Sequence, residues 1–450
     1  MLDMNGNSWF KIYGTRLINL PYIGVSLERF FTPLFIVLKW LIPKRGFALS
    51  TEALELARRS KKNAGTKNEN SKEIVLVNRN LMQGQIGGVN FLVLILAFGL
   101  QERGHNVTIL CESPNPWKIS KTINGISIIG IRPKLFFIRH TSPSLYAGWS
   151  QSVENFLDNS PGQGKVINVF ATIAGLETFR TRKLPVHIKS FCYLVTDHII
   201  HKVGVNQDYK KSLRISRFLS AEHMFLTSRD THVIGDSKAI VKDISRVLEL
   251  PDLVANTEII HIGWPTNDHL EEFDLPNGKL VTYIGAVSFR KGTRTLIDAW
   301  KLICNHPQYS DCFLVICGPT SDDPESEAII KNSKVSDRIV RIKSMSEGQK
   351  SFILSKSSVV VIPSKYESFG IVALEAMQQG CQIIASRVGG LPEVLGDCAE
   401  FFTPGSSEEL AQKIQSVISG LLHIPIDKII ERANIFSFET MLARFEDIFE

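Results

Sequence analysis

Two glutamates, Glu367 and Glu375, are the residues whose type and spacing most clearly indicate chemistry in this chain. They bracket the start of an expected helix that Gly370 opens and Gly380 closes. Helical side chains tilt toward the N-terminus, so both carboxylates and the amides of Gly370 and Ile371 can face one small volume. The amides favour an anion, and carboxylates that accept hydrogen bonds favour hydroxyl groups. The pattern therefore predicts a ligand that carries both a diphosphate and sugar hydroxyls. For two isolated glutamates, a solvent-exposed Glu367 and a Glu375 that only supports the helix would be the preferred explanation.

The residues around this pair predict a strand, a loop, a helix and a second strand. Residues 359–362 are a short apolar run rich in β-branched side chains, typical of a buried strand. Ser368 is a suitable N-cap for a helix over residues 370–379. We expect the next strand over residues 381–385 and a close backbone approach at Gly389-Gly390.

The complete string resembles a known motif. Glu367 and Glu375 are separated by seven residues within PSxxESFGxxxLEAMxxG, which is followed by GGLPE. This is similar to the donor-site motif of the GT4-type retaining glycosyltransferases (glycosyl transferases group 1, GT-B fold). The resemblance covers most of residues 72–450 and not the first seventy. It implies an α/β fold with two Rossmann-like domains that face each other across a cleft.

The resemblance also implies a reaction, namely transfer of a hexosyl unit from a nucleotide diphosphate sugar to a hydroxyl acceptor with retention of the anomeric configuration. Glu375 is then expected to bind the ribose hydroxyls and Glu367 the hydroxyls of the donor sugar. Lys291, with Arg290, and the amides near Gly370 are expected to hold the diphosphate. No required cofactor or metal is expected, because the sequence shows no cluster of metal ligands.

The region before residue 265 begins with a β-α-β pattern. We expect a strand over residues 73–77, a glycine-rich loop, a helix over 89–103 and a strand over 105–110. Gly88 lets the backbone approach a phosphate or sugar at the end of the first strand. In the family, an aspartate or histidine at a later strand end reaches the donor sugar, and here Asp197 and His198 occupy that place in reversed order. The sequence leaves open which of the two faces the cleft.

The expected phosphate-binding loop departs from the family at one position. Family members usually carry an arginine after the first glycine, where this chain has Ala286. Arg290 or Arg294 compensates, or phosphate binding is weaker. For Arg294, a solvent-exposed position on the helix is a credible alternative.

The domain boundaries follow from these patterns. We expect an extension and linker over residues 1–70, an acceptor domain over 71–265 and a nucleotide-sugar domain over 266–430. Apolar residues at helical spacing predict helices over residues 407–422 and 430–449. The last helix, residues 431–450 in the domain division, is expected to cross back to the first domain.

Composition and charge limit the classes of function. The 450 residues contain 44% hydrophobic and 21% charged residues, as in ordinary globular proteins. The net charge is +6 over residues 1–70, +7 over 71–265 and −7 over 266–450. The seven cysteines form no metal-binding spacing and are expected to be reduced core residues. Nucleic-acid binding is not expected, because the basic residues lack interleaved aromatic residues.

Residues 1–70 have a character of their own. Residues 30–43 are apolar but number about fourteen, fewer than the roughly twenty of a membrane-spanning helix. Their aromatic, aliphatic and basic residues predict a segment that lies in the interface of an anionic membrane. A hairpin packed on the first domain is the alternative.

Together these features predict a cytoplasmic protein, peripheral at the inner face of a membrane, with a lipid-linked or glycan acceptor in surface polysaccharide or glycolipid assembly. Three alternatives remain open: a glycosyltransferase with a soluble acceptor, a nucleotide-sugar epimerase of the same fold, and a catalytically inactive partner subunit.

Overall fold

The structure is a computed structural model that describes residues 71–78, 88–112, 120–131, 143–159, 167–172, 188–194, 226, 231–267, 269–320 and 324–449. The extension over residues 1–70, most of the glycine-rich loop, and Asp197 and His198 lie outside these residues. The chain forms two compact units. The first takes the chain up to Ile234 together with Ile244–Thr257 and the last two residues, and the second takes Gly235–Asp243 and Glu258–Ile448.

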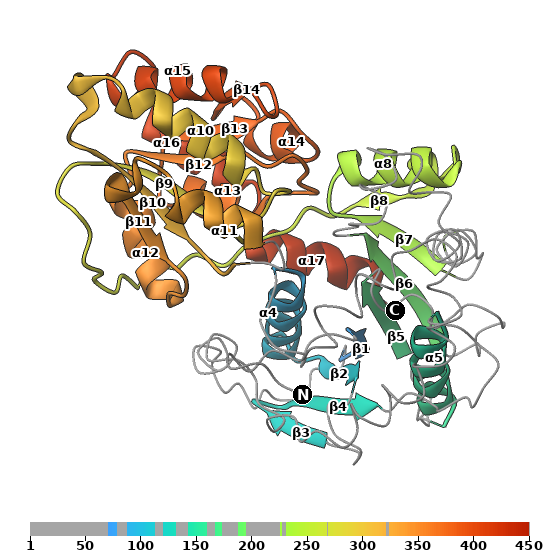
Figure 1. Cartoon of the computed structure of the whole chain (residues 1–450). Coiled ribbons are helices and arrows are strands. Elements are labelled where there is room, and N and C mark those ends of the chain that lie inside the picture. The colour runs from blue at the N-terminus through green and yellow to red at the C-terminus, as the bar shows by residue number, and fades with distance from the viewer. Residues whose placement is uncertain are drawn as a thin grey trace, which may run out of the picture. The chain divides into compact units, whose positions relative to one another are not determined.

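One sheet has eight strands in the order β3-β4-β2-β1-β5-β6-β7-β8 (Figure 1). Its central strands run parallel, and only the β3–β4 pair among the pairings we describe is antiparallel. The strands are β1 (Glu73–Val77), β2 (Asn106–Glu112), β3 (Ser120–Ile123), β4 (Ile126–Ile131), β5 (Ile167–Thr172), β6 (Ile188–Leu194), β7 (Thr231–Gly235) and β8 (Glu258–Ile259). The accompanying helices are α4 (Gly88–Glu102), α5 (Pro143–Asp158), α8 (Lys238–Leu248) and α9 (Leu253–Asn256).

The first strand and helix agree with the sequence. β1 has the expected bounds, and α4 begins at Gly88, one residue before the expected start. Residues 92–100 of α4 are buried throughout, because this stretch is apolar on every side of the helix. The predicted β-α-β opening is thus confirmed.

The second sheet has six parallel strands in the order β11-β10-β9-β12-β13-β14. They are β9 (Lys279–Ile284), β10 (Cys312–Cys317), β11 (Ile339–Ile342), β12 (Val359–Ile362), β13 (Ile383–Ser386) and β14 (Glu400–Phe402). The helices are α10 (Thr293–Cys304), α11 (Pro324–Lys331), α12 (Glu347–Lys356), α13 (Ile371–Gln378), α14 (Leu391–Leu395), α15 (Ser407–Ile418), α16 (Ile426–Asn434) and α17 (Phe438–Ile448). Short 3-10 helices cover Pro307–Tyr309 and Ser336–Arg338.

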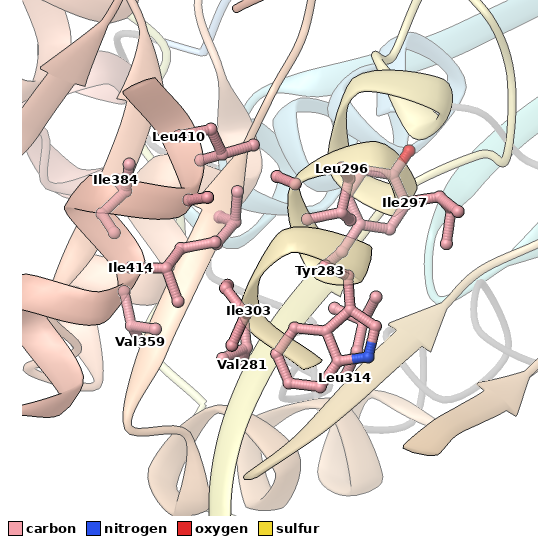
Figure 2. Close-up of a cluster of buried hydrophobic side chains, with 14 of the residues drawn as sticks. Val281, Tyr283, Leu296, Ile297, Ile303, Leu314, Val359, Ile384, Leu410 and Ile414 are labelled. Atoms are coloured by element: carbon pink, nitrogen blue, oxygen red, sulfur yellow. The ribbon is translucent and has the colours of Figure 1, made fainter. Parts of the chain in front are cut away.

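The alternation of side chains along the strands builds two cores, one on each face of this sheet. Val281 of β9 packs with α10 and α15 on one face (Figure 2). Its neighbour Leu280 packs on the other face with Ile353 of α12. Both faces are buried, which explains why the strands read as continuous apolar runs.

The C-terminal end differs from the prediction. The single helix expected over residues 430–449 is wrong, because α16 ends at Asn434 and α17 begins at Phe438. The side chain of Ser437 accepts a hydrogen bond from the amide of Thr440, 3.1 Å away, as an N-cap does. Ser437 therefore starts a new helix inside the apolar pattern. The ring of Phe449 then packs edge-on against Phe191 of β6, with 5.1 Å between the ring centroids.

All seven cysteines are free thiols; six are buried, as expected of core residues, and Cys304 is partly buried. Within the described ranges, every helix is too short or too polar to cross a membrane.

Candidate active site

Two neighbouring loops form the base of the candidate site. β9 and β12 are adjacent and parallel, so the loops that follow them leave the same edge of the sheet. The amide of Lys365 donates a hydrogen bond to the Arg290 carbonyl over 2.8 Å, which joins the two loops. A Cβ on Gly292 would lie 1.8 Å from the Pro363 carbonyl oxygen, so only glycine allows this approach.

This contact places Lys291 beside Glu367. The ammonium Nζ of Lys291 lies 2.5 Å from the carboxylate Oε2 of Glu367, and both side chains are largely buried. The hydroxyl of Ser364 donates to the same oxygen over 3.1 Å. Burial alone would raise the pKa of Glu367, but the charge and hydrogen bond of Lys291 outweigh it. The pKa of Glu367 is therefore lower than usual, and its side chain is an ionised acceptor.

The start of α13 supplies unpaired backbone donors, as expected. Gly370 is the N-cap, with φ +105°, and a Cβ there would lie 2.6 Å from Leu391 Cδ2. Among the described residues, the amides of Gly370 and Ile371 have no hydrogen-bond acceptor. These two amides and the helix dipole suit an anion. The ammonium group of Lys291 pairs with Glu367, three residues before Gly370 in the chain.

Ser368 is not the N-cap, which corrects the prediction. Its position three residues before the helix starts is too early, because Gly370 in its left-handed conformation makes the turn into α13. Ser368 is buried, and its carbonyl accepts a hydrogen bond from the hydroxyl of Ser237 over 2.6 Å. Ser237 itself caps α8 by accepting a hydrogen bond from the Ile240 amide at 3.3 Å.

The Gly389-Gly390 loop fixes the backbone of Glu367. The amide of Gly390 donates to the Glu367 carbonyl over 3.0 Å. A Cβ on Gly389 would lie 1.8 Å from that same oxygen. The glycine pair thus makes the predicted close approach, and this approach holds the loop that carries Glu367.

Glu375 is the buried carboxylate of α13. Its Oε1 accepts a hydrogen bond from Lys350 Nζ of α12 over 2.5 Å, and its side chain is 7% exposed. Lys350 also lies 2.7 Å from Glu347, one helical turn earlier. Two carboxylates outweigh the burial of Lys350 and raise its pKa above the ordinary value. Sequence reasoning missed Lys350, because no local spacing connects α12 to α13.

Trp264 supports Glu375 from the segment after β8. Its side chain favours the ionised form of Glu375. Its carbonyl accepts a hydrogen bond from Gln378 Nε2 over 2.8 Å, one turn further along α13. The carbonyl of Trp264 therefore holds this helix.

A third glutamate, Glu393 of the GGLPE string, has a capping role. It accepts a hydrogen bond from the amide of Lys238 at the start of α8 over 2.9 Å. His261 Nε2 lies 2.8 Å from its Oε1. These hydrogen bonds outweigh the effect of burial and lower the pKa of Glu393.

The arginines of the first loop separate into two kinds. Arg294 is 69% exposed and pairs with Asp298 on its own helix at 3.9 Å, so it takes the solvent-exposed alternative. Arg290 is half-buried, and its charge helps to lower the pKa of Glu367. At Ala286, the carbonyl accepts a hydrogen bond from the hydroxyl of Tyr283 over 2.8 Å.

The remaining residues that the sequence predicts for the site either belong to the first unit or lie outside the residues that the structure describes. Gly88 is the first residue of α4. Asp197 and His198 lie outside the described residues, so their roles stay predictions. Over the described ranges, no three His, Cys, Asp or Glu side chains come together as metal ligands would.

Part of the chain is similar to known proteins. Residues 267–432 match the profile of the family described as glycosyl transferases group 1. The chain is 24% identical over 331 residues to an uncharacterized glycosyltransferase of Methanocaldococcus jannaschii, which spans 69% of this chain and 79% of that protein. It is 34% identical over 182 residues to the alpha-maltose-1-phosphate synthase of Mycobacterium tuberculosis, where the match spans 37% of this chain and 46% of that protein.

A solved structure shows the same fold. The Anabaena protein HepE, crystallised with UDP and glucose, superposes with a TM-score of 0.61 and 18% identity. The superposition covers 84% of this chain and 98% of that one.

Proposed function

We propose that this chain moves a hexosyl unit from a nucleotide diphosphate sugar to a hydroxyl acceptor with retention. Support comes from the match of residues 267–432 to the glycosyl transferases group 1 and from the GT-B fold. The observation that carries the proposal is the pair formed by Lys291 and Glu367, 2.5 Å apart and next to the unpaired amides of α13. Cation and amides suit the diphosphate, and the carboxylate suits sugar hydroxyls.

In this proposal, each group acts on charge that develops in the reaction. The bond between the anomeric carbon and the phosphate oxygen breaks while the acceptor oxygen bonds to the same face of that carbon. The proton of the acceptor hydroxyl passes to the departing phosphate oxygen, so the nucleoside diphosphate leaves with it. Lys291 and the amides of Gly370 and Ile371 stabilise the negative charge of the leaving group. In this scheme the acceptor oxygen is the nucleophile, and no carboxylate of the described residues bonds to the sugar.

The two glutamates bind the parts of the donor that do not react. Glu367, ionised because of Lys291, accepts hydrogen bonds from hydroxyls of the transferred sugar. Glu375 accepts from the ribose hydroxyls. Gly88, Asp197 and His198 of the N-terminal half are proposed to reach the donor.

We further propose that the acceptor is lipid-linked or a glycan at the cytoplasmic face of an anionic membrane. Support comes from the sequence, whose first 265 residues are basic and whose residues 30–43 are apolar. Surface polysaccharide or glycolipid assembly is the corresponding class of pathway. The proposal includes no metal cofactor and no nucleic-acid partner.

The proposal is tested by calorimetric binding of UDP-, GDP- and ADP-sugars to the full chain and to Glu367→Gln and Glu375→Gln. We expect one nucleotide class to bind, and each variant to bind its sugar about tenfold to a hundredfold more weakly. Glu408→Gln, an exposed glutamate in the first turn of α15, is the matched control and should bind like the wild type.

Retention is tested separately by proton NMR of the freshly transferred or hydrolysed sugar. The first anomer to form should be that of the donor. Absence of binding to all three nucleotide classes would overturn the proposal and favour the inactive partner subunit. Isomerisation of the donor without any acceptor would favour the epimerase.

A further inference from the structure

Lys350 is a buried cation of the candidate site that the motif around the two glutamates does not include. Its side chain is 14% exposed. Its Nζ lies 2.5 Å from Glu375 Oε1 and 2.7 Å from Glu347 Oε2. One lysine therefore neutralises a carboxylate on each of two helices, α12 and α13.

The charge of Lys350 matters because Glu375 is buried. Burial disfavours an ionised carboxylate, and Glu347 beside it disfavours the charge further. An ionised carboxylate accepts hydrogen bonds at both oxygens, whereas a protonated one has given up part of that capacity. Hydrogen bonds to an ionised acceptor are also roughly twice as strong as neutral ones. Ligand binding by Glu375 thus depends on a compensating cation.

Glu347 and Trp264 define how Lys350 and Glu375 are held. Glu347 lies three residues before Lys350 on the same helix and pairs with its ammonium. The Trp264 side chain also favours the ionised form of Glu375. The charge of the carboxylate is therefore supported from two different segments.

We propose that Lys350 is a positioning residue that keeps Glu375 ionised and aimed at the ribose hydroxyls of the nucleotide. The inference rests on the proposed function, since it concerns the donor part of that site. Lys350 touches Glu375 and is not assigned a contact with the substrate. Removal of Lys350 should appear as weaker nucleotide binding. Ribose contacts that are equally strong in the ground state and in the transition state contribute to binding and not to the rate of the chemical step.

The experiment measures binding of UDP, GDP and ADP, and of their 2′-deoxy forms, to the full chain at pH values from 6 to 9. The variants are Lys350→Met, Lys350→Gln and Lys350→Arg, with Glu375→Gln as the reference for a neutral site. Two uncharged replacements are used so that the result does not depend on one of them folding. Lys356→Met is the matched control, because Lys356 is exposed at the end of the same helix and lies over the Phe352 ring.

At pH 7 we expect Lys350→Met and Lys350→Gln to bind the nucleotide about tenfold more weakly than the wild type. This ratio should shrink as the pH rises, because Glu375 without its cation then ionises again. The preference for the ribonucleotide over its 2′-deoxy form should fall toward that of Glu375→Gln. Lys350→Arg should restore most of the affinity, and Lys356→Met should bind like the wild type.

A uniform loss of affinity at every pH with an unchanged 2′-deoxy preference would overturn the positioning role, as would wild-type affinity in both uncharged variants. In either case Glu375→Gln still weakens binding, so the proposed function stands. If the wild type binds no nucleotide, the proposed function and this inference both fail.

Discussion

Lys291 and Glu367 come from loops that follow different strands, yet their charged groups lie 2.5 Å apart. Each group therefore neutralises the other until a ligand binds between or beside them. In the proposed function, a diphosphate that binds Lys291 has to compete with Glu367, and a sugar hydroxyl then takes the place of the ammonium on the carboxylate. The proposal thus makes this pair the connection between recognition of the phosphate and recognition of the sugar.

Lys291→Met should weaken binding of the nucleoside diphosphate about tenfold to a hundredfold, because a hydrogen bond between two charged groups is lost. Calorimetric titration measures this change. Arg294→Met is the matched control, because Arg294 is exposed and pairs on its own helix. Equal losses in both variants would contradict the assignment of Lys291 to the diphosphate.

Glu367 should make the protein more stable above pH 4.5 than below it. Its pKa is lower in the folded chain than its ordinary value of 4.5, chiefly because of Lys291. The stabilisation is then fully present above the unfolded value and is lost as the pH falls through the lower folded value. Urea unfolding between pH 3 and 7 should show that the free energy of unfolding falls more steeply with decreasing pH for the wild type than for Glu367→Gln. Parallel pH curves would show that the ion pair contributes no stability.

Gly292→Ala should destabilise the second unit and weaken donor binding together. Its φ is +75°, and a Cβ would lie 1.8 Å from the Pro363 carbonyl oxygen, so the loops that carry Lys291 and Glu367 must separate. Gly405→Ala is the control, because Gly405 has φ +86° and nothing within 4 Å of a Cβ. The control should show only the cost of the left-handed conformation, about 1–2 kcal/mol.

Thermal unfolding compares the two alanine variants, and nucleotide titration reports on the site. A Gly292→Ala variant that loses no more stability than Gly405→Ala would contradict the close approach of the two loops.

Deletion of residues 1–45 should reduce membrane association without loss of nucleotide binding. The deleted residues contain the apolar stretch 30–43 and several basic residues. Co-sedimentation with vesicles of phosphatidylglycerol and of phosphatidylcholine measures the effect, and the full chain should prefer the anionic vesicles. Unchanged sedimentation of the shortened chain would remove the argument for a membrane-facing acceptor.

The local elements and the motif were predictable from sequence because they depend on short-range patterns. The apolar runs that became β1 and β12 have the expected bounds, and Gly370 and Gly380 mark the two ends of α13. The break between α16 and α17 was missed, since apolar spacing continues through it and only the cap at Ser437 marks it. Apolar periodicity alone does not show where one helix stops and another begins.

The ion pairs of the site could not be predicted from the sequence. Lys291 is 76 residues from Glu367, and Lys350 is 25 residues from Glu375. Charge alone suggested Lys291, because it precedes an expected helix start. Nothing marked Lys350, since its role follows from the packing of α12 beside α13, which is a property of the folded sheet.

Asp236→Asn should stabilise the protein at neutral pH. Asp236 follows β7 and is fully buried, and the nearby Ser237 and Ser368 hydroxyls, which favour its ionised form, do not compensate for that burial. The neighbouring Ser237 hydroxyl donates to the Ser368 carbonyl instead. Burial, with Glu393 and Glu367 nearby, raises the pKa of Asp236 well above its ordinary value. The folded chain thus binds this proton more tightly than the unfolded chain, so wild-type stability falls as the pH rises past about 4.

The asparagine variant carries no titrating group at this position and should lose that dependence. Its advantage in unfolding free energy should be largest near pH 7 and should vanish toward pH 4. Urea unfolding at both pH values measures the difference, with Asp274→Asn, an exposed aspartate, as the control. A variant that is less stable than the wild type at pH 7 would show that the Asp236 carboxylate is ionised and has a favourable partner, which would reverse the role inferred from its burial.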